Sequence, residues 1–129
     1  MGNFRPIAEN ITLRFIKMKA KLKFKSKEII INDIRKVSFI GKFTGLMFKP
    51  KETCVLLFEF SKGRRTIHSF FCPVFLAIWL LEGKIVDYKL VKPNLVSIRP
   101  EKEFDKLIEI PFNKKYSYVV NVFIDEGKV

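Results

Sequence analysis

The residues of this sequence best suited to chemistry are one histidine, His68, and two cysteines, Cys54 and Cys72. Histidine is the side chain whose ordinary pKa permits proton transfer near neutral pH. A nucleophile beside it would be Ser69 or one of the cysteines, but no spacing in the chain matches a known catalytic triad. We therefore expect His68 to be structural or to contact a ligand, and an enzyme centred on His68 is the weaker alternative.

A metal site made of these three residues fails on distance. Donor atoms on one zinc ion lie within about 4 Å of one another. If His68 and Cys72 lie four residues apart on a strand, about 13 Å separates them. The glycines at Gly41 and Gly45 also fit neither the dinucleotide nor the P-loop pattern. We predict neither a metal nor a cofactor.

The two cysteines permit a second interpretation. Apolar strands are predicted at Val55–Phe60 and Ile67–Cys72, on either side of a polar turn. If that hairpin is symmetric about Gly63, Cys54 faces Cys72 with the two Cα atoms about 4.5 to 5.5 Å apart, which is within disulfide range. We predict a contact between the two cysteines across the strands, and a disulfide is an open alternative.

The clearest surface signal is a run of alternating lysines. The even positions between them are apolar, from Met18 to Phe24. Period two predicts an antiparallel strand with one wet, cationic face, followed by a turn at Ser26-Lys27 and a partner strand at Glu28–Ile31. A basic amphipathic helix is the alternative, because apolar residues from Ile7 to Leu22 fall at roughly helical spacing. The lysines of the predicted face are Lys17, Lys19, Lys21, Lys23 and Lys25.

The charge of the chain is uneven. Twenty-five basic and thirteen acidic residues give a net charge of +12, and residues 1–51 carry +10 of it. With Arg64 and Arg65, the lysines form a candidate surface for nucleic acid or another anionic macromolecule. Nineteen lysines and no glutamine also fit the surface of a thermophile protein, which would need no anionic partner.

The chain is organised around the stretch from Ile67 to Lys92. Twelve apolar residues run from Phe70 to Leu81, fewer than the roughly 20 that a membrane span needs. Pro73 breaks the run, and both faces of a strand at Val74–Leu81 are apolar, so we expect that strand to be covered on each side. Glu82-Gly83 predicts a two-residue hairpin turn, after which the second arm is half buried with Asp87 and Lys89 on its polar side.

These signals predict a single, mainly β domain, a small antiparallel barrel or sandwich that is closed or partly open. Seven or eight strands are expected, with one or two short helices. We expect a lead-in at residues 1–16, a tail at 125–129, a cytoplasmic location, no transmembrane segment, and a monomer or dimer. The carboxylates of Glu101, Glu103 and Asp105 should form a solvated turn. The remaining predicted elements are a helix at Ser38–Phe43 ended by Gly45, a weak strand at Leu95–Ile98, one helical turn after Pro100, and strands at Lys106–Ile110 and Tyr116–Ile124.

Several short motifs occur in a characteristic order. They are Gly45-Leu46-Met47-Phe48-Lys49, Val55–Phe60, Ile67-His68-Ser69-Phe70-Phe71, Glu82–Asp87 and Ile108-Glu109-Ile110-Pro111. In this order the chain resembles the archaeal form of the domain of unknown function 192 family, over about residues 21–112. The resemblance implies a β-dominated fold, and it makes Met47, His68 and Phe70 the candidates for ligand contact. Where the family pattern has Pro and Asp, this chain has Phe75 and Ala77, so any role of that Asp cannot be transferred.

Core signals are abundant and catalytic signals are few. We therefore expect a non-catalytic binding or accessory domain, with a nucleic-acid-binding module that uses the lysine strand as the alternative. Both hypotheses require that the alternating lysines reach solvent together.

Overall fold

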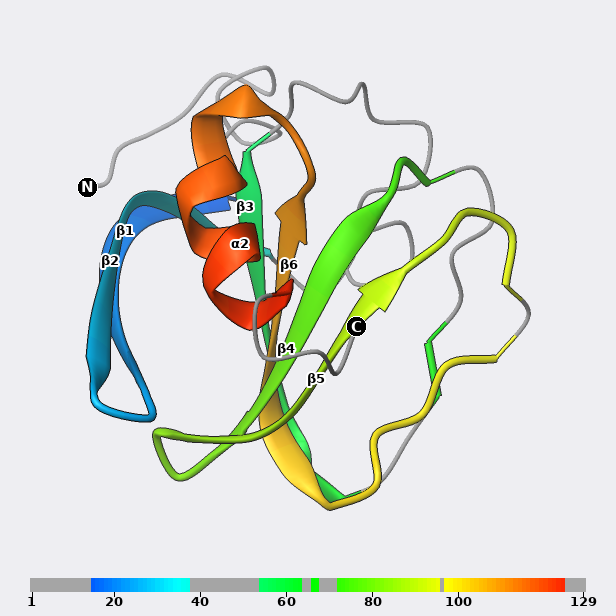
Figure 1. Ribbon diagram of the computed structural model, residues 1–129. Helices are drawn as coiled ribbons and strands as arrows, with labels where there is room; N and C mark the ends of the chain where they lie inside the picture. The colour runs from blue at the N-terminus through cyan, green and yellow to red at the C-terminus, as the bar shows by residue number, and fades with distance from the viewer. Residues whose placement is uncertain (1–14, 38–53, 64–65, 68–71, 96, 125–129) are drawn as a thin grey trace, which may run out of the picture.

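The computed structural model describes residues 15–37, 54–63, 66–67, 72–95 and 97–124 of the 129-residue chain. The alternation of apolar and polar residues over most of this length produces extended strands, and a short helix follows the last of them (Figure 1). The elements are β1 (Phe15–Phe24), β2 (Lys27–Val37), β3 (Val55–Gly63), β4 (Phe75–Leu81), β5 (Lys84–Val91), β6 (Phe104–Pro111), the 3-10 turn η2 (Lys114–Tyr116) and α2 (Ser117–Ile124).

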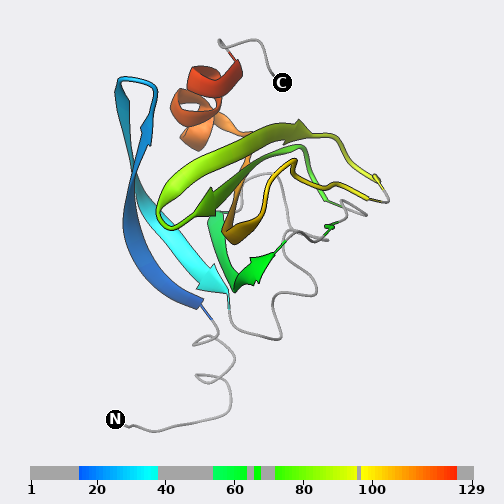
Figure 2. The ribbon, with the colours of Figure 1, turned by 90° about the horizontal axis from the view of Figure 1, so that it is seen from below.

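The six strands form one curled sheet in the order β1-β2-β3-β6-β4-β5. All neighbours are antiparallel except β2 and β3, which run parallel. Seen from below (Figure 2), hairpin β1–β2 stands at a steep angle to β4 and β5, and α2 lies in the angle between them. The predicted mainly β, partly open barrel with a short helix is confirmed, with six strands among the described residues.

Hairpin β4–β5 follows the sequence prediction closely. Side chains from Phe75 to Ala77 are fully buried, as are those of Ile78 and Trp79. Both faces of β4 are covered because an apolar core packs against each face of the sheet, and β5 and β6 pair with its two edges. The turn consists of Glu82 and Gly83, with φ angles of 52° and 81°, the left-handed geometry that a tight two-residue hairpin requires.

Two apolar cores lie on the two faces of the sheet. The concave face packs against α2, and the opposite face carries a second cluster that includes Trp79, Phe104 and Cys72. The edge strands β1 and β5 approach each other through an aromatic contact between Phe24 and Tyr88, whose ring centroids are 5.1 Å apart. Phe123 of α2 contacts both rings, at 4.3 Å and 4.9 Å. The helix therefore fills the space that an incompletely closed barrel would leave empty.

The predicted last strand, Tyr116–Ile124, is wrong. This segment forms the end of η2 and then α2, capped by Asn113, whose side chain accepts a hydrogen bond from the Tyr116 amide. The buried residues recur at helical spacing, and they are Tyr116, Val119, Val120 and Phe123. Apolar and aromatic residues also alternate in this segment, at Tyr116, Tyr118, Val120, Val122 and Ile124, so the sequence pattern was ambiguous. The segment adopts the helix because a helix presents one apolar face to the concave side of the sheet.

The predicted hairpin between Val55–Phe60 and Ile67–Cys72 is also wrong. The two neighbours of β3 are β2 and β6, with Leu56 opposite both Arg35 and Glu109. Ile67 instead forms a bridge with Ile98, through two backbone hydrogen bonds of 2.8 Å. Long-range pairing thus replaces the local hairpin, because a strand inside the sheet needs a partner on each side.

Smaller corrections concern the connections. The first turn is formed by residues 25 and 26, one position before the prediction, and the first two strands extend further than expected. The helical alternative for the lysine segment is wrong over β1. Ile98 makes only an isolated bridge, and no helical turn follows Pro100. The expected helix at Ser38–Phe43, the lead-in up to residue 14 and the tail at 125–129 lie outside the described residues.

Among the residues that the structure describes, no helix combines the length and the apolar composition needed to cross a bilayer.

Candidate functional site

The lysine face consists of Lys19, Lys21, Lys23 and Lys25 at the exposed edge of the sheet. All four are exposed, whereas Leu22 and Phe24 between them are buried, at 4% and 8% exposure. The predicted alternation is therefore confirmed for these residues. Strand geometry separates alternate side chains by about 6.6 Å, so the ammonium groups form a row rather than a cluster.

Around Lys19, Lys21 and Lys23, the positive charge of this face is only slightly compensated. Lys21 lies 3.9 Å from the Glu28 carboxylate, and both side chains are at least half exposed. In the described part of the chain, no acidic side chain lies within ion-pair distance of Lys19 or Lys23. Arg35 adds an exposed cation further along β2. A surface with so few counter-charges favours anionic partners.

Two hollows flank the tip of the hairpin. One, of about 220 Å³, lies between residues 23–25, at the end of β1 and the start of the turn, and residues 85–88 on β5. The other, of about 280 Å³, lies at the turn and includes Ser26, Lys27 and Glu28. Lys23 and Lys25 line both hollows. An anion bound at the tip of hairpin β1–β2 would therefore lie close to both lysines.

Asp87, expected on the wet side of its strand, is buried at 3% exposure. Its Oδ1 accepts a hydrogen bond from the Tyr88 amide at 2.8 Å, and its Oδ2 accepts one from the Glu101 amide at 3.0 Å. Lys89, which alternates with it, remains exposed. The covering segment at Glu101, and not the alternation of the strand, buries Asp87. Asp87 is also one of the residues that line the hollow next to β1, where sequence reasoning had placed no functional residue.

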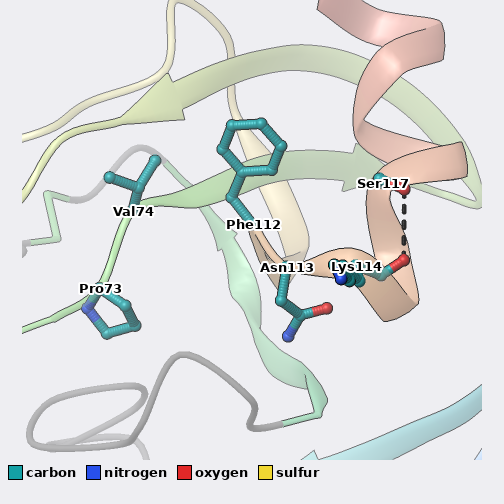
Figure 3. A pocket seen from close by; sticks show the side chains of 6 residues that line it. All are labelled: Pro73, Val74, Phe112, Asn113, Lys114 and Ser117. Carbon is teal, nitrogen blue, oxygen red and sulfur yellow. Dashed lines mark hydrogen bonds between the residues drawn. The ribbon is translucent and has the colours of Figure 1, made fainter.

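A larger cavity of about 540 Å³ lies where β4 begins and α2 starts (Figure 3). This is the end of the half-barrel opposite the turns of both hairpins (Figure 1). Backbone atoms of Phe112 and Val74 are hydrogen-bonded beside it, N to O at 3.0 Å. Sequence reasoning missed this cavity, because its walls come from segments about 40 residues apart. The described residues that line it are Pro73, Val74, Phe112, Asn113, Lys114 and Ser117.

Cys72 is a buried thiol with little nucleophilic character. Burial and, to a smaller extent, the negative charge of Glu109 raise the pKa of Cys72 to about 11. The thiol is therefore neutral near pH 7, when a nucleophile would need to be a thiolate. Neither Cys54 nor Cys72 forms a disulfide. The predicted contact between them loses its basis, because the hairpin that would place them opposite each other does not form.

Of the acidic residues after Pro100, Glu101 and Glu103 are exposed, as expected, whereas Asp105 is half-buried in β6. Glu103 is exposed and lies 3.8 Å from Lys62, and Asp105 accepts a hydrogen bond from the Glu82 amide at 3.3 Å. Among the described residues, no group of three or more His, Cys, Asp or Glu side chains could hold a metal ion.

Several predicted site residues lie outside the described parts of the chain. They are Met47, Arg64, Arg65, His68 and Phe70, and the side chain of Lys17 in β1. The structure therefore brings together the lysines of β1 and leaves the family-motif candidates as predictions.

Comparison with known proteins gives matches only among solved structures. No family model matches the chain, and no curated protein matches it. A candidate transcription regulator from Sinorhizobium meliloti superposes with a TM-score of 0.65 at 15% identity, covering 75% of this chain and 81% of its own. A protein of unknown function from Novosphingobium aromaticivorans superposes with a TM-score of 0.60 at 11% identity, covering 81% and 77%. At these identities the likeness establishes a shared fold and no function.

Proposed function

We propose that this protein is a non-catalytic binding domain whose lysine face holds the phosphate backbone of a nucleic acid. The observation that carries the proposal is the row of exposed lysines on one edge of the sheet, from Lys19 to Lys25. Their spacing along the strand suits successive phosphates of an extended single strand, and such contacts supply sequence-independent affinity.

The scarcity of catalytic groups supports a binding role. In the described residues no metal-ligating cluster occurs, and the Cys72 thiol is neutral at physiological pH. An enzyme centred on His68 remains a separate hypothesis. If an activity is found, replacement of His68 by Ala tests it, and unchanged turnover would contradict it.

The lysines also have a structural explanation that the experiment must separate from binding. Charged side chains on an edge strand prevent open-ended pairing with other sheets. That role requires no ligand and predicts no affinity for nucleic acid. The similarity in fold to a candidate transcription regulator is compatible with a nucleic-acid ligand, but it concerns that protein. A cytoplasmic location, as predicted from the sequence, would fit such a ligand.

Fluorescence anisotropy with a labelled 20-nucleotide single strand and the matching duplex tests the proposal. We expect binding at 50 mM salt that weakens steeply towards 200 mM, because each neutralised phosphate of a single strand contributes about −0.7 to the slope of log K against log salt. The double variant Lys21→Glu/Lys23→Glu should bind at least about tenfold more weakly at 50 mM salt.

A matched double variant, Lys92→Glu/Lys102→Glu, changes the net charge by the same amount at exposed sites outside the lysine face. It should retain most of the affinity. No binding by the wild-type protein at low salt, or equal losses in the two double variants, would overturn the proposal.

We further propose that the chain is a divergent member of the domain of unknown function 192 family. The order of the motifs supports this assignment. In the register of the sheet, Ala77 lies opposite Glu109, so the position of the family's Asp borders a buried carboxylate. Superposition on a solved family member should align Ile108–Pro111 with that family's last motif in the same register, and a shifted register would argue against membership.

A further inference from the structure

We infer that the cavity at the start of α2 is a second binding site, for a small amphipathic molecule with an apolar body and one carboxylate. This site lies at the end of the half-barrel opposite the tip of hairpin β1–β2, so it is separate from the lysine face (Figure 1). Its volume of about 540 Å³ falls within the range of about 300 to 1,000 Å³ that is typical of small-molecule sites.

The cavity exists because the sheet ends abruptly at this point. Pro73 lies two residues before β4, and Pro111 is the last residue of β6. Neither proline has a backbone N–H, so the ladder cannot continue past them as a regular sheet. The chain then turns through η2 into the concave face, which leaves a hollow between the start of β4 and the start of α2 (Figure 3).

The two sides of the cavity differ in chemistry. Pro73, Val74 and Phe112 supply an apolar wall, whereas Asn113, Lys114 and Ser117 supply polar groups from the side of α2. Small-molecule sites commonly combine a mostly apolar lining with a few polar groups that orient the ligand.

Hydrogen bonds fix the polar side. The Asn113 side-chain oxygen accepts from the Tyr116 amide at 3.2 Å, and the Ser117 hydroxyl donates to the Lys114 carbonyl at 3.2 Å. Both bonds lie within the first turn after β6, so the wall is held in place before a ligand arrives. A preformed site requires less ordering of the protein on binding.

The charge of the lining selects an anion. Lys114 is exposed, and in the described part of the chain no acidic side chain lies within ion-pair distance of it. The described residues of the lining include no Asp or Glu. A carboxylate next to Lys114 would therefore gain a cationic partner while its apolar body covers Val74 and Phe112, and a neutral molecule of the same shape would gain only the second contact.

Titration with octanoate and with octan-1-ol, followed by backbone amide NMR spectra, tests the inference. We expect octanoate to bind saturably, with the largest shifts at Phe112, Asn113 and Ser117, and octan-1-ol to bind at least about fivefold more weakly. Lys114→Glu should weaken octanoate binding at least about fivefold and leave octan-1-ol binding unchanged. Lys102→Glu, the same charge change at an exposed site outside the cavity, should have no effect.

Filling the cavity gives an independent check. Val74→Phe should abolish binding of both molecules, provided that the thermal unfolding midpoint shows the variant to be folded; if it does not fold, Lys114→Glu decides alone. Octan-1-ol binding as tightly as octanoate, shifts centred elsewhere, or equal losses in Lys114→Glu and Lys102→Glu would overturn the inference. The variant Lys21→Glu/Lys23→Glu should retain octanoate binding, so this site and the nucleic-acid proposal can fail separately.

Discussion

Hairpins β1–β2 and β4–β5 have similar local structure and opposite relations to solvent. Each is antiparallel, has a two-residue turn and contains a left-handed residue there, Lys25 with φ 51° and Glu82 with φ 52°. In β4 the side chains of both faces are buried, because β4 has strands on both sides and a core on each face. In β1, at the edge of the sheet, only the concave side is covered.

The difference teaches that the position of a strand in the sheet, more than its own hairpin, decides what its side chains can do. The inner hairpin supplies core, and the edge hairpin can present a charged row to a partner without losing stability. Pairs of variants, at a buried and an exposed position or at the two turns, test this dependence on position.

The largest difference in the free energy of unfolding should come from truncating large apolar side chains. Trp79→Ala in β4 removes a fully buried indole, so we expect the free energy of unfolding to fall by about 3 to 5 kcal/mol. Ile30→Ala in β2, where the side chain is 44% exposed, should change it by less than about 1 kcal/mol. Urea denaturation measures both. Similar losses at the two positions would show that the edge hairpin is buried in solution.

A smaller contrast concerns polar residues that alternate along a strand. Asp87→Ala leaves two backbone N–H groups without their acceptor, so it should destabilise by about 2 to 3 kcal/mol. Lys89→Ala, two residues further along the same strand and exposed, should stay within about 0.5 kcal/mol of wild type. Thermal unfolding followed by circular dichroism compares them. If Asp87→Ala left the stability unchanged, the segment at Glu101 would not be held on β5 by this carboxylate.

Removing a glycine from one turn and introducing one in the other should change the free energy of unfolding in opposite directions. Gly83 has φ 81° and open space where a Cβ would be, so the cost of Gly83→Ala, about 1 kcal/mol, is conformational. Lys25→Gly removes a Cβ from the same backbone region and should stabilise by up to about 0.5 kcal/mol. Chemical denaturation of both variants measures the shifts, and destabilisation by Lys25→Gly would contradict the left-handed geometry at that turn.

The smallest effect concerns the pKa of Cys72, beside β4. Glu109→Gln removes the negative charge that helps to raise this pKa, so the pKa should fall from about 11 but stay above its ordinary value, because burial is the larger cause. The rate of alkylation by iodoacetamide between pH 8 and 11, read by mass spectrometry, reports the thiolate fraction. Glu103→Gln, at an exposed carboxylate, is the control. An unchanged profile would exclude Glu109 as a cause.

Sequence patterns predicted best where a strand and its partner are adjacent in the chain. The lysine strand, the buried arm before Glu82 and the turn at Gly83 were all predicted, because alternation and turn chemistry are local properties. For the candidate site, this was enough to identify the lysine face, although not the hollows beside it. Those hollows depend on the approach of β5 to β1, which no local pattern encodes.

The failures have one cause. The cysteine hairpin, the last strand and the exposure of Asp87 were inferred from neighbours in sequence, whereas the structure decides them by neighbours in space. The segment from Tyr116 to Ile124 is apolar enough to be a strand or a helix, and the uncovered concave face selects the helix. Asp87 is buried by a loop that follows it by 14 residues.

The sequence by itself determined that the chain is mainly β, that one arm is buried on both sides, and that one strand carries a cationic row. These features depend on side-chain alternation and on residues that tolerate a positive φ, which act over a few positions. Only the tertiary structure decided the parallel pairing of β2 with β3, the helix in the concave face, the burial of Asp87 and the cavity between β4 and α2. These depend on contacts between segments far apart in the chain, whose free energy is gained only when the whole sheet has curled and both of its faces are covered.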